Sequence, residues 1–230
     1  MNNFVSFLYS QSVLLPLLIG LIRIRKIERS FHPFLVLIML AALTELLSFI
    51  SIKMFQTNAI VSNVYCLLEC LLILYQFYRW HFHARHRKWY WVIPAALSLV
   101  WIIENLVFMK ITDFGPVFRI SYAFLIVVLS INEINYLITH ENRQLFRNAR
   151  FLICIGFIIY FLYQILFEGS LNAAAEESNP VISNRIISLA VYINVLVNLI
   201  FAAAMLCIPA KKFDFNRTME KLKKHPGSSR

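Results

Sequence analysis

Charged residues are scarce in this sequence of 230 residues. Only 15% are Asp, Glu, Lys or Arg, where a soluble domain has about a quarter, and 60% are hydrophobic. So few charges cannot cover the surface of an ordinary soluble domain. The sequence also lacks a Walker A loop, a G-x-S-x-G serine elbow and a Rossmann dinucleotide fingerprint. These absences exclude the common nucleotide-dependent and serine-hydrolase classes.

Long apolar runs take up most of the chain. Seven of them reach about 18 residues, the length that crosses a bilayer as a helix. We therefore expect an all-α polytopic membrane protein, a seven-transmembrane-helix bundle over residues 1–210 followed by a basic cytoplasmic tail over residues 211–230. The connection 168–185 is the longest one expected on the outer side; we expect a flexible connection there, with a short helix on the outer surface as the alternative. The expected spans are 4–22, 31–52, 59–78, 89–109, 116–138, 151–168 and 186–208.

Lysine and arginine gather on one side of these spans. All but four of the 22 lie in the connections after the first, third and fifth spans or in the tail. The positive-inside rule then places the N-terminus outside and the C-terminus in the cytoplasm. Basic charge in this arrangement reflects topology and contact with anionic lipid headgroups at the cytoplasmic loops, so we expect no nucleic-acid partner. The four residues on the other side are Lys53, Lys110, Arg119 and Arg185.

Four glutamates lie within the expected spans. A charged side chain at the bilayer centre costs about 2.5–3.5 kcal/mol, so these residues must face the bundle interior. No lysine or arginine lies deep in any expected span, and we expect no ion pair to neutralise the carboxylates. Protonation, hydrogen bonds from neutral donors, or a bound cation remain as ways to accommodate them. The four are Glu45, Glu69, Glu104 and Glu133.

Neutral polar residues share helix faces with some of these glutamates. Tyr65 stands four residues before Glu69, and Asn194 stands four residues before Asn198, so each pair lies on one helix face. We predict a ligand- or ion-binding pocket in the outer half of the bundle and a separate inner polar cluster. Alternatively, the same side chains only join helices through hydrogen bonds. The predicted pocket consists of Glu45, Asn63, Tyr65, Glu69, Glu104, Asn194 and Asn198, and the inner cluster of Asn132, Glu133, Asn135 and Tyr136.

The segment HFHARH after the third span carries three histidines at ligand-like spacing. Basic residues stand among and beside them and would repel a metal ion. The several histidine boxes of enzymes resembling the membrane di-iron desaturases are also absent. We therefore expect no metal, no cofactor and a basic loop at the headgroups. The metal candidates that we do not favour are His81, His83 and His86.

Two spans carry a resemblance to a known group. The third span, NVYCLLECLLILYQFYRW, and the last, YINVLVNLIFAAAML, resemble uncharacterised seven-span bacterial inner-membrane proteins with a Tyr-x3-Glu element, here Tyr65 and Glu69. The resemblance implies a multi-pass location in the bacterial inner (plasma) membrane. It implies no particular activity.

Three functions are compatible with this sequence. The first, which we favour, is a non-catalytic ligand-sensing or signalling bundle with an outward-facing polar pocket for a small molecule and a cytoplasmic or membrane signalling partner. The second is a small proton- or cation-coupled transporter using Glu69. Only five glycines and no inverted repeat count against it. The third is an intramembrane lipid-modifying enzyme, but no nucleophile–base arrangement supports catalytic residues.

Overall fold

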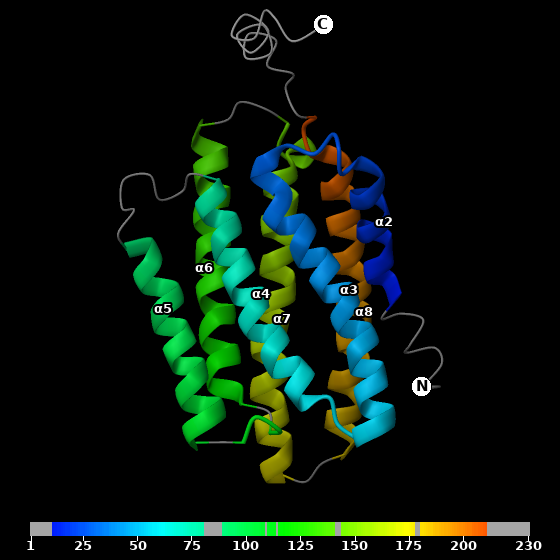
Figure 1. Ribbon diagram of the computed structural model, residues 1–230, viewed down its shortest axis with the longest axis vertical. Helices are drawn as coiled ribbons and strands as arrows, with labels where there is room; N and C mark the ends of the chain where they lie inside the picture. The colour runs from blue at the N-terminus through cyan, green and yellow to red at the C-terminus, as the bar shows by residue number, and fades with distance from the viewer. Residues whose placement is uncertain are drawn as a thin grey trace, which may run out of the picture.

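The computed structural model describes residues 11–80, 89–108, 110–113, 115–140, 144–177 and 180–210; for 89–90, 171–177 and 180–187 it describes the backbone alone. The chain forms a bundle of helices that run along one long axis (Figure 1). Within the described ranges there is no strand, and one isolated bridge joins Ile27 to Ala210. The predicted all-α class is therefore confirmed.

The helices follow the apolar runs of the sequence. By length and composition, six of the described helices could cross a membrane, and a shorter apolar helix covers Gln11–Arg23. That short helix is the described part of the first expected span. The elements in chain order are η1 (Gln11–Val13), α2 (Leu14–Arg23), η2 (Arg29–Phe31), α3 (His32–Phe55), α4 (Ala59–Arg79), α5 (Trp89–Ile102), η3 (Ile103–Phe108), α6 (Pro116–His140), η4 (Leu145–Arg147), α7 (Ala149–Glu177) and α8 (Pro180–Cys207).

The expected long connection at 168–185 is mostly helical instead. α7 continues to Glu177, and α8 begins at Pro180. Three consecutive alanines at 173–175 favour the helix, and no glycine or proline interrupts the sequence between Ser170 and Pro180. Proline at the first position of α8 is compatible with a helix start, because that residue needs no amide donor. The expectation of a long outer loop was therefore wrong.

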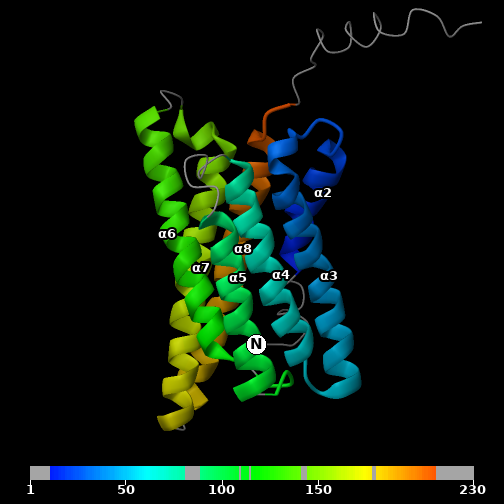
Figure 2. The same ribbon diagram turned by 60° about the vertical axis from the view of Figure 1, so that its left-hand side comes forward.

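The helices pack as an antiparallel bundle with α7 between α6 and α8. The most extensive contacts join α7 to α8, α6 to α7 and α3 to α4. α5 lies on the outside of the bundle, where it contacts α4 and α6 (Figure 1 and Figure 2). α2 packs against α3 and α8 on the opposite side. The α3–α4 connection lies at the bottom of Figure 1, and we call that part of the bundle the lower half.

Side chains cap helix ends in the upper half. Gln76 of α4 accepts a hydrogen bond from the backbone amide of Phe34 at 2.8 Å and donates one to the carbonyl of Ser30 at 2.7 Å. Both backbone groups lie at the start of α3, where helical partners are missing. At the end of α8, the Arg23 guanidinium donates to successive carbonyls and places a positive charge at the helix C-terminus, where it is favourable. The acceptors are the carbonyls of Met205, Leu206 and Ile208.

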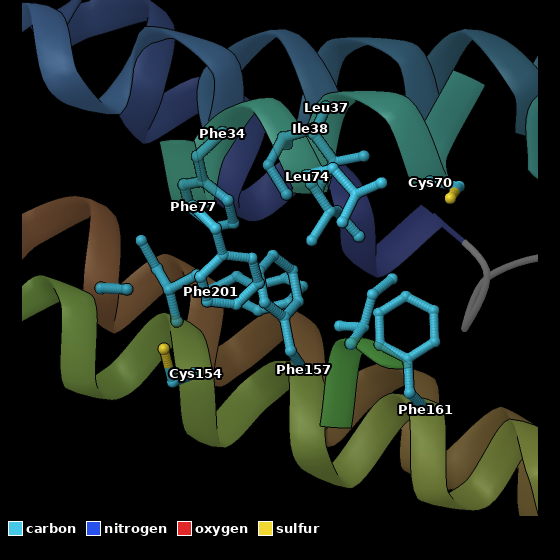
Figure 3. Packing of buried hydrophobic residues seen from close by; sticks show 14 of the residues in the cluster. Phe34, Leu37, Ile38, Cys70, Leu74, Phe77, Cys154, Phe157, Phe161 and Phe201 are labelled. Atoms are coloured by element: carbon cyan, nitrogen blue, oxygen red, sulfur yellow. The ribbon is translucent and has the colours of Figure 1, made fainter. Parts of the chain in front are cut away.

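A cluster of phenylalanines fills the core of the upper half. We call Phe34, Phe77, Phe157, Phe161 and Phe201 the aromatic cluster (Figure 3). Its rings meet edge to face, with centroids 5.2 Å apart for Phe34 and Phe201 and 5.6 Å apart for Phe157 and Phe201. Such arrangements favour aromatic pairs beyond the area they bury. The cluster joins α3, α4, α7 and α8 above the site described next.

Candidate functional site

A cavity of about 420 Å³ lies among α3, α4, α6, α7 and α8. The parts of α4 and α6 that line it belong to the lower half of the bundle, and on the upper side it ends against Phe157, Phe161 and Phe201 of the aromatic cluster. Its volume falls within the range of small-molecule pockets, roughly 300–1,000 Å³. Polar side chains from all five helices face this space.

Glu69 is held at the cavity by two tyrosines. The Tyr65 hydroxyl donates to its Oε1 at 2.7 Å and the Tyr122 hydroxyl donates to its Oε2 at 2.8 Å. The Gln164 amide in turn donates to the Tyr122 oxygen at 3.0 Å. Glu69 is only 4% exposed and lines the cavity. We call Tyr65, Glu69, Tyr122 and Gln164 the Glu69 relay.

The relay satisfies both oxygens of the Glu69 carboxyl group. When Tyr65 and Tyr122 both donate to it, Tyr122 accepts from Gln164 and Glu69 accepts at both oxygens, as an ionised carboxylate does. A protonated Glu69 would donate its proton to one of the two tyrosine oxygens at the same distance. The relay therefore holds a carboxyl group of α4 at the wall of the cavity, and its negative form is the one that both tyrosine donors stabilise.

Arg119 forms an ion pair next to the relay. Its Nη1 lies 3.1 Å from Glu168 Oε1, and the two side chains are 11% and 9% exposed. Its Nη2 donates to Ser62 Oγ at 2.9 Å and to Asn63 Oδ1 at 3.0 Å. Arg119 and Glu168 both line the cavity. The expectation that no ion pair would neutralise Glu45, Glu69, Glu104 or Glu133 was wrong for Glu133, which lies 3.8 Å from Arg150. The buried pair of Arg119 with Glu168, a residue at the end of an expected span, was missed as well.

The position of Arg119 in its helix explains this error. Arg119 stands three residues after Pro116, so the sequence places it at the membrane boundary with the outer connection. It shares a helix face with Tyr122, one turn later, and that face is turned into the bundle. A boundary arginine can extend inward along its own helix face. The i,i+3 spacing of Arg119 and Tyr122, and the i,i+4 spacing of Gln164 and Glu168, are the signals that we missed.

Asn63 lies beside the cavity and is not part of its lining. Its amide nitrogen donates to the carbonyls of Ile111 and Asp113 at 2.9 and 2.8 Å, while its oxygen accepts from Arg119. Its backbone carbonyl accepts from the indole of Trp101 at 3.0 Å. Each polar group of the side chain therefore has a partner. Asn63 joins α4 to the connection before α6 and supports Arg119 from outside the predicted pocket.

Glu104 does not line the cavity either. It lies in the π-helical turn η3, and its two carboxylate oxygens accept from the backbone amides of Val117 and Phe118 at 2.8 and 2.6 Å. These amides open α6 and lack helical partners, so Glu104 caps that helix. A Cβ on Gly115 would lie 2.7 Å from the Glu104 carboxyl carbon, which explains the glycine there. The predicted pocket role of Glu104 is replaced by this capping role.

The remaining predicted pocket residues do line the cavity. They are Glu45 of α3 and the pair Asn194 and Asn198 of α8. The Asn198 amide donates to Ser12 Oγ at 2.8 Å and to Asn194 Oδ1 at 3.3 Å. The two asparagines therefore share a face, as their spacing predicts. The structure brings Glu45, Tyr65, Glu69, Asn194 and Asn198 around one space, and binding there stays a prediction.

The predicted inner cluster is not assembled. Glu133 is 1% exposed and its carboxylate lies 3.8 Å from Arg150 of α7. The other three members, Asn132, Asn135 and Tyr136, are exposed on outward faces of α6. Neighbouring residues on a helix point in different directions, so only Glu133 faces the core.

The described residues were searched for a metal site, and the chain was compared with known proteins. No group of three or more His, Cys, Asp or Glu residues that could hold a metal occurs in the described ranges. The candidates His81, His83 and His86, like the basic tail at 211–230, lie outside them. Comparison of the chain with protein-family models, with curated proteins and with solved structures found no match.

Proposed function

We propose that this chain is a seven-span bacterial inner-membrane protein that binds a small molecule from outside and signals without catalysis. One observation carries the proposal: a cavity of ligand size, lined by the Glu69 relay and the Arg119–Glu168 pair, ends against the aromatic cluster. Such a site offers a small molecule polar contacts at the Glu69 relay and apolar contacts at the aromatic cluster. A site of this kind suits the sensing of a small molecule.

The proposed topology has an outer N-terminus and a cytoplasmic C-terminus. The short apolar helix Gln11–Arg23 lies within the first expected span, and α3 to α8 alternate in direction. Arg25, Lys26 and Arg147 lie in connections at the upper end, together with the end of α8. The positive-inside rule assigns that end to the cytoplasm, so the cavity lies nearer the outer face. The basic upper end would then meet anionic lipid and a signalling partner.

Ligand binding is favoured over helix joining because the cavity has unused polar capacity. The Tyr160 hydroxyl lines the cavity and makes no hydrogen bond with another described residue. Glu69 accepts one bond at each oxygen, and each carboxylate oxygen can accept a second. If these groups served only to join helices, their hydrogen-bond donors and acceptors would all be satisfied by one another.

The test uses thermal unfolding of the purified protein in nanodiscs with a panel of small molecules. We expect at least one compound to raise the unfolding temperature of the wild type and not of Glu69→Gln. Glu133→Gln is the matched control, because it removes a buried carboxylate outside the cavity lining. The control should keep the ligand response. A panel without any response, or equal responses in all three proteins, would refute the proposed site.

A transport function is the second candidate, and the Glu69 relay is the observation that favours it. A carboxylate joined to two hydroxyls inside a bundle is an arrangement that could pass protons or bind a coupling cation. Uptake of the stabilising compound into proteoliposomes, with and without a proton gradient, separates the two functions. Concentrative uptake that Glu69→Gln abolishes would establish transport. Binding without uptake would support sensing.

A further inference from the structure

We infer that the ligand of the cavity is a small organic cation with an apolar or aromatic body. This inference rests on the proposed binding function and names the chemical class that the site would take. Its first ground is the balance of charge in the lining. The described lining contains three glutamates, Glu45, Glu69 and Glu168, against one basic residue, Arg119.

Arg119 is already committed to protein partners. Its two terminal nitrogens contact Glu168, Ser62 and Asn63 at 2.9–3.1 Å. An anionic ligand would have to displace Glu168 from a buried ion pair and lie near the negative Glu69. A cationic ligand leaves that pair intact and meets a carboxylate whose other donors are neutral tyrosines. Charge complementarity therefore selects a cation.

The second ground is the aromatic side of the cavity. Tyr160, Tyr163 and Phe167 follow one another at helical spacing on α7, and all three line the space. Aromatic faces attract ammonium groups, and the attraction increases when water is excluded. The same rings provide apolar contact for the rest of the molecule. An organic ammonium ion uses both the carboxylate and the rings.

A metal ion fits this site less well. Ca²⁺ takes six to eight oxygen ligands and Mg²⁺ six, and a single carboxylate such as Glu69 supplies at most two of them. No group of three potential metal ligands of the His, Cys, Asp and Glu types occurs among the described residues. A cavity of about 420 Å³ is also far larger than a bare ion requires. Its volume suits a molecule of the size of a phenylalkylamine.

The test compares three probes that share a phenyl group and differ in charge: 2-phenylethylammonium, 2-phenylethanol and phenylacetate. Binding is measured by titration calorimetry on the full chain in zwitterionic nanodiscs, with empty nanodiscs as the background and Na⁺ and Mg²⁺ salts as further probes. We expect the ammonium probe to bind about tenfold or more tightly than the alcohol, and the anion to bind most weakly. Glu69→Gln should remove most of the difference between the ammonium probe and the alcohol. Glu133→Gln should leave it unchanged.

Any different outcome refutes either the cationic ligand or the binding function itself. Equal or tighter binding of the alcohol or the anion refutes the cation and leaves the proposed binding function standing. Glu69-dependent binding of Na⁺ or Mg²⁺ alone refutes an organic ligand. If none of these probes binds while a compound of the thermal panel does, the cation inference fails alone; if nothing binds in either assay, both fail. If Glu69→Gln does not fold, the comparison of the three probes on the wild-type protein still tests the preference for a cation. The variants Glu45→Gln and Tyr160→Phe then test the lining of the same cavity.

Discussion

Replacing Arg119 and Glu168 singly and together tests whether their contact is a buried ion pair that the fold requires. In Arg119→Met the Glu168 carboxylate loses its charged partner, and in Glu168→Met the guanidinium loses that carboxylate and retains the neutral acceptors Ser62 and Asn63. Breaking one side of a buried pair costs about 3–5 kcal/mol, so we expect each single substitution to lower the free energy of unfolding by that amount.

The double substitution Arg119→Met with Glu168→Met should lower the free energy of unfolding by much less than the sum of the two single substitutions. It leaves no uncompensated charge, and its remaining cost is the unpaired oxygens of Ser62 and Asn63, about 1–3 kcal/mol. The coupling energy of the cycle should therefore reach at least about 3 kcal/mol. Reversible unfolding in mixed micelles, followed by tryptophan fluorescence, provides the four free energies.

The chain contains a matched comparison in Arg150 and Glu133. This pair has the same chemistry, but its N–O distance is 3.8 Å and Arg150 is 23% exposed, against 3.1 Å and 11% for Arg119. A more exposed and more distant pair gives a smaller coupling. Additive single effects at Arg119 and Glu168, or an equal coupling in the two cycles, would refute the assignment of a tight buried pair.

Three further substitutions test packing and capping in the bundle, each by thermal unfolding in detergent. Gly156→Ala would place a Cβ against the ring of Phe201, closer than side chains can pack, and should cost about 1–3 kcal/mol. Gly169→Ala, the control, meets nothing within 4 Å and should be neutral or stabilising, so equal effects of the two would contradict the packing. Gln76→Leu removes the acceptor of the Phe34 amide, a 2.8 Å bond, and should cost about 1–3 kcal/mol; an unchanged unfolding temperature would show that this cap is dispensable.

Most of the helical architecture was predictable from hydropathy. Bilayer-length apolar runs must be helical, and the expected run 59–78 corresponds to α4 at Ala59–Arg79 almost residue for residue. The error at 168–185 arose because hydropathy marks where a helix leaves the apolar layer, and the helix itself need not end there. Alanine-rich sequence carries α7 on to Glu177.

The site was predictable only in part, because it depends on which way each side chain points. Spacing on one helix correctly paired Tyr65 with Glu69, since both positions lie on the same face. Spacing cannot show which helix faces it, so Tyr122, which donates the second hydrogen bond to Glu69, was missed. Grouping Glu133 with its sequence neighbours failed for the same reason.

The buried carboxylates of this bundle are held by different kinds of donors, and the kind of donor separates structural from functional roles. Glu104 accepts backbone amides at a helix start, and Glu133 and Glu168 each lie against an arginine. Those partners supply the positive charge or dipole that a buried anion needs. Glu69 receives only tyrosine hydroxyls, which satisfy its oxygens without a formal positive charge, and it lies at a cavity. Since burial is common to all four, the lack of a direct positively charged partner at Glu69 is what distinguishes this residue and supports the binding role proposed for it.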